Sequence, residues 1–215
     1  MPRQTGRPPR LSRDAIATAA EAIVEKHGIE ALTMRRLAKE LDSSPMALYR
    51  HVRDKDELLL LLLDRAAAEL PRDSLPEEPR ARVLALFQLL YEGLSERPWI
   101  SGVLVKGDLI APSVLWAIDE IITAFVAAGL SPREAGAAYL VAWRYTVGHL
   151  TVRQETVRRA AELDRPPKVL KALAAPDPDQ LPMLAQLKDF WLAARSRDTY
   201  GEDLAAVVDG LLARA

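Results

Sequence analysis

Hydrophobic positions recur every three or four residues along most of the chain, which is the period of an amphipathic α-helix. No segment alternates apolar and polar residues as a half-buried strand would. Residues 163–182 are rich in Pro and Asp and are expected to form a poorly ordered loop. The expected helices, divided by Pro and Gly, span residues 12–27, 54–70, 80–96, 98–106, 112–128, 131–160, 183–195 and 202–214. The sequence therefore predicts an all-α fold.

The segment 32–59 departs from this pattern, because its capping signals define two short helices joined by a tight turn. Leu37 lies on the apolar face of the first helix, and Leu48 points to the core from the second. Ser44 can cap the backbone N–H groups of the second helix, and Pro45 suits its first position because no donor is needed there. The sequence therefore predicts that the second helix buries the face with Leu48 and leaves its other face exposed to solvent.

A third helix begins directly after this pair. Asp54 followed by Glu57 three residues later is a capping box, which starts the helix, and Lys55 at this end is placed to contact a phosphate. Two short helices across a tight turn are the arrangement of a helix-turn-helix, whose second helix reads the major groove. The candidate DNA-binding residues are Thr33, Arg35, Ser44, Pro45, Ala47, Tyr49, Arg50, His51 and Lys55.

The residues of this segment also resemble a known family. TMRRLA at 33–38 followed by LYRHV at 48–52 is similar to the DNA-binding domain of the tetracycline-repressor (TetR) family, over residues 11–70. In the turn, Asp42 and Ser43 replace the glycine and apolar residue common in that family. Aspartate tolerates the left-handed backbone conformation better than most residues, so we expect the turn to be kept.

Residues 1–10, where Arg3, Arg7 and Arg10 stand among Gly and Pro, are expected to form a flexible basic arm. The resemblance implies a three-helix DNA-binding domain at 11–55 and a larger helical domain at 56–215. It further implies a ligand-responsive transcriptional regulator, more readily a repressor than an activator. Such a protein binds a palindromic DNA operator as a homodimer, because two heads related by a two-fold axis read two half-sites. A small apolar or amphipathic effector releases it.

Charge is unevenly distributed along the chain. Residues 1–55 carry 11 Lys and Arg against 7 Asp and Glu, an excess of four positive charges, whereas the whole chain has a net charge of −1. Local excess matters for phosphate attraction, which acts over a Debye length of about 10 Å. The arm at residues 1–10 is either a minor-groove contact or a solubilising tail, and the sequence leaves both open.

Two apolar features predict how subunits meet. The helix from residue 131 is apolar nearly all round from Ala135 to Trp143, so it must be covered on more than one side. The apolar stripe of the last helix can dock on its own subunit or on another, and the resemblance favours the second. The candidate dimer-interface residues are Gly136, Leu140, Leu204, Val208 and Leu211.

Most of the aromatic residues follow the DNA-binding segment, and aromatic side chains with few polar groups are usual in an apolar ligand site. Core packing is the more frequent explanation for any single one of them, and only the cluster as a whole favours a cavity. Arg144 and His149 follow the apolar part of a long helix, so they are expected to meet the interior and orient an effector's oxygen. The candidate ligand-binding residues are Phe87, Tyr91, Trp99, Trp116, Phe125, Trp143, Arg144 and His149.

Other function classes have less support in the sequence. The chain has no cysteine and only three histidines, and it lacks the Gly-rich phosphate loop, HExxH and Gly-x-Ser-x-Gly motifs, so we expect neither an enzyme nor a cofactor or metal site. The longest leucine run is too short to span a bilayer, so the protein is expected to be cytoplasmic. An architectural, ligand-independent DNA-binding protein remains the alternative, because it would share the same head.

Overall fold

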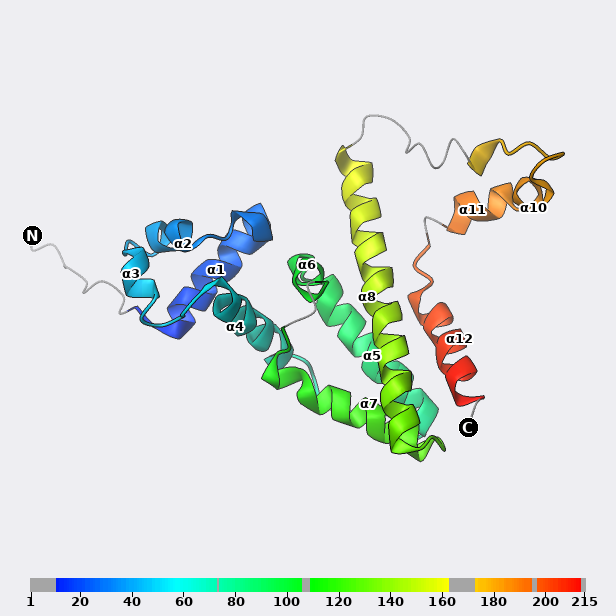
Figure 1. Cartoon of the computed structure of the whole chain (residues 1–215), viewed down its shortest axis with the longest axis horizontal. Coiled ribbons are helices and arrows are strands. Elements are labelled where there is room, and N and C mark those ends of the chain that lie inside the picture. Colours follow the sequence, from blue (N-terminus) through cyan, green and yellow to red (C-terminus); the bar gives the residue numbers. More distant parts are fainter. Residues whose placement is uncertain (1–10, 73, 106–108, 163–172, 195–196, 214–215) are drawn as a thin grey trace, which may run out of the picture. The chain divides into compact units, whose positions relative to one another are not determined.

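The computed structural model describes residues 11–72, 74–105, 109–162, 173–194 and 197–213 (Figure 1). Within these ranges every regular element is an α-helix or a short 3-10 helix and no strand occurs, which confirms the predicted all-α fold. The contacts divide the chain into two compact units. Met1–Ser74 and Glu92–Glu120 form the first unit, and Leu75–Tyr91 and Ile121–Ala215 form the second.

The first unit holds the predicted helix-turn-helix. Its elements are α1 (Arg13–His27), the 3-10 turn η1 (Ile29–Ala31), α2 (Met34–Glu40), α3 (Pro45–Leu48), α4 (Lys55–Ala68), α6 (Trp99–Leu104) and the 3-10 turn η2 (Pro112–Val114). Ser12 caps α1, since its hydroxyl oxygen accepts a hydrogen bond from the Ala15 N–H at 3.1 Å. Gly28 ends α1 with a φ of 78°. Both ends of α1 therefore lie where the sequence predicts them.

One hydrophobic core joins the helices of the first unit. Ile16 of α1, Leu37 of α2, Leu48 of α3 and Leu62 of α4 are all completely buried in it. Complete burial of such a side chain stabilises the fold by about 1.5–3 kcal/mol. Because α4 shares this core, the compact unit continues past residue 55, where the sequence analysis placed the end of the DNA-binding domain.

The turn between α2 and α3 is closed by a left-handed residue. Asp42 has a φ of 45° and donates its N–H to the Lys39 carbonyl at 3.2 Å. The Ser43 N–H donates to the Ala38 carbonyl at 2.8 Å, which completes a Schellman motif. Gly129 takes the same place after α7, with a φ of 113°. Aspartate thus fills a position that glycine usually occupies, as the sequence predicts.

The second unit is built around a long helix. It contains α8 (Pro132–Glu162), α10 (Pro182–Gln186), α11 (Lys188–Ala194) and α12 (Tyr200–Leu212), with the first part of α5 (Pro79–Ser95) and the last part of α7 (Leu115–Ala127). Helix α12 packs along α8 (Figure 1). Ser131 and Glu134 form a capping box at the start of α8, because each accepts the other's backbone N–H, at 3.4 and 2.9 Å.

The predicted single helix at 183–195 is wrong, because the chain leaves the helical path at Leu187 and forms α10 and α11. A continuous helix of this length depends on a buried face, but Met183, Leu187 and Phe190 are 63%, 40% and 59% exposed. Of the predicted loop at 163–182, residues 163–172 lie outside the described ranges, and the described remainder starts with two helical residues.

Candidate functional site

The two helices of the helix-turn-helix are each started by a predicted DNA-contact residue. The hydroxyl oxygen of Thr33 accepts a hydrogen bond from the Arg36 N–H at 3.2 Å, and that of Ser44 accepts one from the Ala47 N–H at 3.2 Å. Each hydroxyl keeps its own hydrogen, which can be donated to a phosphate. Thr33 and Ser44 are also exposed, so capping and DNA contact are compatible in both.

Helix α3 presents one face outward and buries the other. Leu48 is buried, as predicted, and so is Val52, while Tyr49 is 47% exposed. Arg35, Pro45 and Arg50 are exposed too, and Ala47 and His51 are half-buried. Side chains of three kinds, aromatic, basic and apolar, thus lie on the surface of one short helix and its flanks. This is the mixture that base edges and phosphates require.

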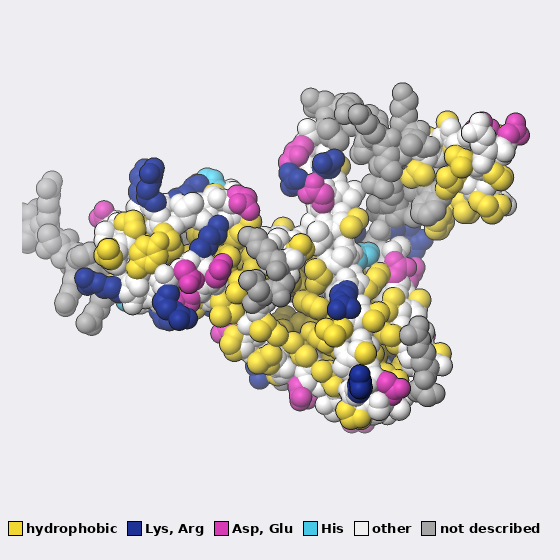
Figure 2. All heavy atoms as spheres, in the orientation of Figure 1, with side chains coloured by type: hydrophobic (Ala, Val, Ile, Leu, Met, Phe, Trp, Pro, Cys, Tyr) yellow, Lys and Arg dark blue, Asp and Glu magenta, His cyan; other side chains and the backbone are white. Residues whose placement is uncertain are grey.

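Met46 lies on the same exposed surface and was missed by the sequence analysis. It is 71% exposed, the largest value among the exposed large hydrophobic side chains of the described chain. A methionine beside Pro45 at a helix start reads as a core residue, because hydrophobicity alone does not reveal which way it faces. Figure 2 shows hydrophobic side chains on the surface of the first unit with Lys and Arg side chains around them.

The start of α4 is fixed by two carboxylates. Asp54 accepts the Glu57 N–H at 2.8 Å, as predicted. Glu57 accepts the N–H of Arg53, at 2.7 Å, whereas a capping box would use the N–H of Asp54. The hydrogen bonds from the Arg53 backbone and side chain, together with Arg13, lower the pKa of Glu57. Lys55 is half-buried at this helix start, where exposed backbone N–H groups favour a phosphate.

Ion pairs join α4 to α1 further along. Arg65 of α4 contacts Asp14 at 2.5 Å and Glu21 at 3.1 Å, both on α1. Burial raises the pKa of Glu21 in spite of the opposing charge of Arg65. At the start of α4, Arg13 of α1 lies 3.1 Å from Glu57. With the shared hydrophobic core, these contacts make α4 and the helix-turn-helix a single body.

A further contact ties α4 to the turn before α7. The backbone N–H of Ser113 in η2 donates to the Asp64 carboxylate of α4 at 2.7 Å. Three residues later, Trp116 is partly buried, and the Arg72 guanidinium lies 4.9 Å from its ring centroid. Trp99, also a predicted ligand residue, is buried in the core of the first unit. Both tryptophans thus belong to the first unit.

The other predicted ligand residues lie in the second unit. Phe87 and Phe125 are completely buried and Tyr91 is 5% exposed, so these three take part in the core. Trp143 is half-buried and stacks on Tyr139 with ring centroids 6.5 Å apart. Burial raises the pKa of Tyr139 to about 12.

Arg144 requires a correction. It was predicted to meet the interior, but its side chain is exposed within the chain. The neighbouring Ala142 and Thr146 are buried, and the 100° turn per residue carries the intervening position away from that face. His149 is half-buried, as an interior polar group would be.

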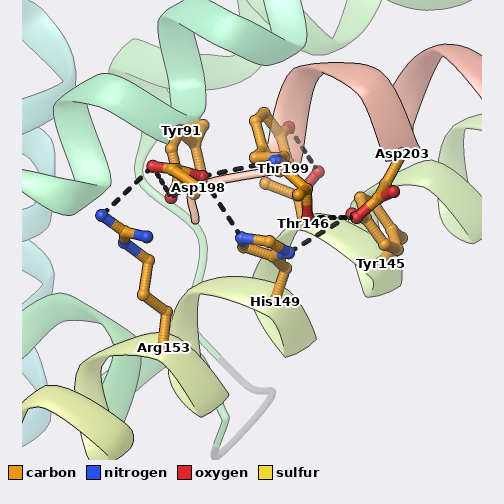
Figure 3. Close-up of polar contacts among 9 residues, drawn as sticks. Tyr91, Tyr145, Thr146, His149, Arg153, Asp198, Thr199 and Asp203 are labelled. Carbon is orange, nitrogen blue, oxygen red and sulfur yellow. Dashed lines mark hydrogen bonds and ion pairs between the residues drawn. The ribbon is translucent and has the colours of Figure 1, made fainter. Parts of the chain in front are cut away.

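A polar network surrounds His149 (Figure 3). The Asp198 carboxylate accepts a hydrogen bond from the Tyr91 hydroxyl at 3.1 Å and pairs with Arg153 at 3.3 Å. His149 Nε2 lies 3.6 Å from Asp198, and His149 Nδ1 lies 3.3 Å from the Tyr145 hydroxyl. Burial acts to raise the pKa of Asp198, but the hydrogen bonds and nearby positive charges lower it.

Tyr200 packs against this network with its ring and anchors its hydroxyl in the core. Its ring stacks on Tyr91 with centroids 3.8 Å apart, and its hydroxyl donates to the Phe87 carbonyl at 3.2 Å and lies 2.9 Å from the Thr146 hydroxyl. Burial raises the pKa of Tyr200. Asp198, Tyr200 and Thr146 were missed by the sequence analysis, because no local spacing signals contacts between residues 54 or more positions apart.

The predicted dimer residues Leu204 and Val208 also require correction. They are 1% and 0% exposed in the single chain, on the face of α12 that packs along α8. Asp209, next to Val208, also pairs with Arg80 of α5 at 2.5 Å. Leu204 and Val208 therefore have no surface left for a partner, and the terminal stripe docks on its own subunit.

The dimer residues predicted on α8 differ from those on α12. Leu140 is 45% exposed, and Gly136 has no atom within 4 Å of the place where a Cβ would lie. Leu211 on α12 is half-buried. The exposed face of α8 also includes Val141 and Val152, which are 44% and 67% exposed. Exposed apolar side chains thus lie along α8, with the exposed Arg144 among them.

Two family models match the chain. That of bacterial regulatory proteins of the tetR family matches residues 16–62, and that of the tetracyclin repressor-like C-terminal domain matches residues 74–215. The HTH-type transcriptional repressor DrrR1 of Streptomyces coeruleorubidus is 31% identical over 224 residues, which cover 96% of this chain and 79% of the relative. An HTH-type transcriptional regulator of Saccharopolyspora erythraea is 31% identical over 151 residues, 69% of this chain and 64% of the relative.

Solved structures share the fold. The TetR family protein ActR of Streptomyces coelicolor, in complex with actinorhodin, superposes with a TM-score of 0.80 at 22% identity, over 96% of this chain and 98% of ActR. BioQ, solved with its double-stranded DNA operator, has a TM-score of 0.67 at 24% identity, over 95% of this chain and 99% of BioQ.

The capped α2 and α3 on a shared core, together with a second helical unit, define a helix-turn-helix DNA-binding regulator. The chain belongs to the TetR family of bacterial transcriptional regulators. No helix in the described ranges has both the length and the apolar character needed to cross a membrane.

Proposed function

We propose that the chain is a cytoplasmic repressor that binds a palindromic operator as a homodimer and is released by a small apolar or amphipathic effector. The observation that supports this most is α3 itself. Its buried side is fixed by Leu48, while Tyr49 and Met46 are exposed beside Arg50. A helix held at both ends with such a face is suited to the major groove.

Phosphate contacts would place this helix on the duplex. Arg35, Thr33 and Lys55 lie at or near the starts of α2 and α4, where backbone N–H groups and the helix dipole favour an anion. Such contacts carry little sequence information but fix the register of the head. The solved complex of BioQ with its operator supports the same use of the fold here.

A homodimer would supply the second head. Helix α8 has the exposed apolar side chains Leu140, Val141 and Val152, which a partner helix could cover. Gly148 on this helix is exposed and has no atom within 4 Å of its Cβ position, so a partner helix can approach closely. We therefore assign the dimer contact to α8, including the predicted residues Leu140 and Gly136, and the half-buried Leu211 of α12 stays a candidate.

Effector control would act through α4. This helix shares the core of the helix-turn-helix and is tied to η2 by the Ser113–Asp64 hydrogen bond. A ligand that displaces the start of α7 would pull on α4, and the Arg65 ion pairs would carry that motion to α1. Binding of actinorhodin by ActR supports a ligand role for this fold.

The experiment has two stages. Selection from a random double-stranded DNA pool should enrich a sequence with two-fold symmetry, and gel-shift titration of that duplex should lose one unit of salt slope in Lys55→Ala, as expected for one phosphate contact. A pool without enrichment would contradict operator binding. An extract of small molecules that never releases the duplex would favour the ligand-independent alternative.

A further inference from the structure

The indole N–H of Trp116 is an unusual group in the first unit. Its Nε1 atom is buried, and among the described residues no hydrogen-bond acceptor reaches it. An indole N–H can only donate, and a buried donor without an acceptor costs free energy. Buried tryptophans usually place this group against a partner. Among the described residues this donor is therefore left for an acceptor that a bound ligand can supply.

Arg72 adds a positive charge at the same ring. Its guanidinium carbon lies 4.9 Å from the Trp116 centroid, within cation–π distance. The Arg72 side chain is exposed, and within the described ranges no carboxylate pairs with it. The Trp116 ring thus has its own donor at its edge and the Arg72 cation over its face. Together these groups complement a negatively charged oxygen.

We propose that Trp116 and Arg72 recognise the carboxylate of an apolar organic anion. One carboxylate oxygen accepts the hydrogen bond from Trp116 Nε1, and the guanidinium of Arg72 balances its charge. Leu115 and Ile110, in the same segment, are 50% and 55% exposed and offer apolar surface for the rest of the molecule. This inference rests on the proposed effector response and names the chemical class of the effector.

The place of Trp116 in the chain gives such a ligand a route to DNA binding. Trp116 follows Ser113 by three residues, which is one helical turn, and the Ser113 N–H is held by Asp64 of α4. An anion bound at Trp116 therefore lies one turn from the contact that ties this segment to α4.

The test is a titration of the ¹⁵N-labelled full-length protein with 2-naphthoate, with neutral 2-naphthamide as the matched probe. The chain has four tryptophans, so the indole region is simple, and Trp116→Phe assigns the Trp116 signal. We expect 2-naphthoate to move the Trp116 indole proton as a new hydrogen bond forms. The Trp99 signal should stay in place, because that ring is buried in the core.

Affinities separate the two groups. Trp116→Phe should weaken 2-naphthoate binding about tenfold to a hundredfold, the loss expected for one hydrogen bond to a charged group. Arg72→Gln should weaken it about tenfold and remove the preference over 2-naphthamide. Arg133→Gln, which removes another exposed charge, at the start of α8, should leave the affinity for 2-naphthoate unchanged.

An unmoved Trp116 signal at millimolar 2-naphthoate would overturn the inference, and so would equal affinities of wild type and Trp116→Phe. In that case a buried water, rather than an anion, satisfies the indole. Operator binding of the ligand-free protein is measured separately, so its loss would refute the proposed function while leaving the titration result intact.

Discussion

The hydrogen bonds within the first unit and those within the second unit join residues at different separations along the chain. In the first, the hydrogen bonds that start α2, α3 and α4 each join residues three positions apart. In the second, Asp198 accepts from Tyr91, which is 107 positions away, and Tyr200 lies against Thr146, 54 positions away. The helix starts of the DNA-reading head are thus specified locally, whereas the polar network of the second unit depends on contacts that only the folded chain brings together.

The largest effect is expected in the second unit. Val208→Asp should lower the free energy of unfolding by about 4 kcal/mol or more, because it places an unpaired charge in a completely buried site. Urea titration followed by circular dichroism measures the loss. Ala206→Asp, on the exposed side of α12, is the control and should change little. A folded, equally stable Val208→Asp monomer would instead return Val208 to the dimer interface.

The next effect concerns DNA reading alone. Tyr49→Ala should weaken binding to the selected operator about tenfold to a hundredfold, which corresponds to about 1–3 kcal/mol. Its side chain is 47% exposed, so thermal stability should hardly change. Tyr49→Phe separates ring packing from the hydroxyl hydrogen bond in the same gel-shift titration. Wild-type affinity in Tyr49→Ala would remove this residue from the interface.

A smaller effect tests the local caps. Ser44→Ala should cost about 1 kcal/mol of stability, because the Ala47 N–H loses its acceptor at the start of α3. Ser43→Ala is the matched control, since Ser43 uses its backbone N–H in the turn and its side chain has no described hydrogen bond. Chemical denaturation compares the two variants. Equal stabilities would show that α3 is positioned by its core contacts alone.

The smallest effect depends on pH. The pKa of Asp198 is lowered below 3.8 in the folded protein, so its contribution to stability is complete above that value and is lost as the pH falls further. Asp198→Asn should therefore be less stable than wild type at neutral pH, by about 0.5–1 kcal/mol given its partial exposure. The difference should shrink in denaturation experiments near pH 3. A constant difference would assign the loss to packing rather than charge.

The local signals of the sequence predicted most of the head. Ser44 and Asp54 cap the helices expected from them, and Asp42 takes the left-handed conformation that its position required. These features depend on residues within one or two turns, so spacing alone reveals them. Met46 shows the limit, because spacing does not tell whether an apolar residue at a helix start faces the core or the solvent.

The second unit could be predicted only in outline. Its helices follow the hydrophobic pattern, but the partner of each apolar face does not. The stripe with Leu204 and Val208 fits a subunit interface and an internal helix contact equally well, and the structure places it against α8. The apolar residues before Arg144 predict that its side chain meets the interior, whereas its angular position on α8 places the side chain on the exposed side of the helix.

The distance between half-sites tests most directly the claim that two heads read one operator. Inserting five base pairs, about half a helical turn, between the half-sites of the selected duplex should abolish tight binding, since the second half-site then faces away. A duplex that contains only one half-site should likewise bind weakly. Equal affinity for the original and the lengthened duplex would contradict a rigid homodimer that places α3 of each subunit in successive major grooves.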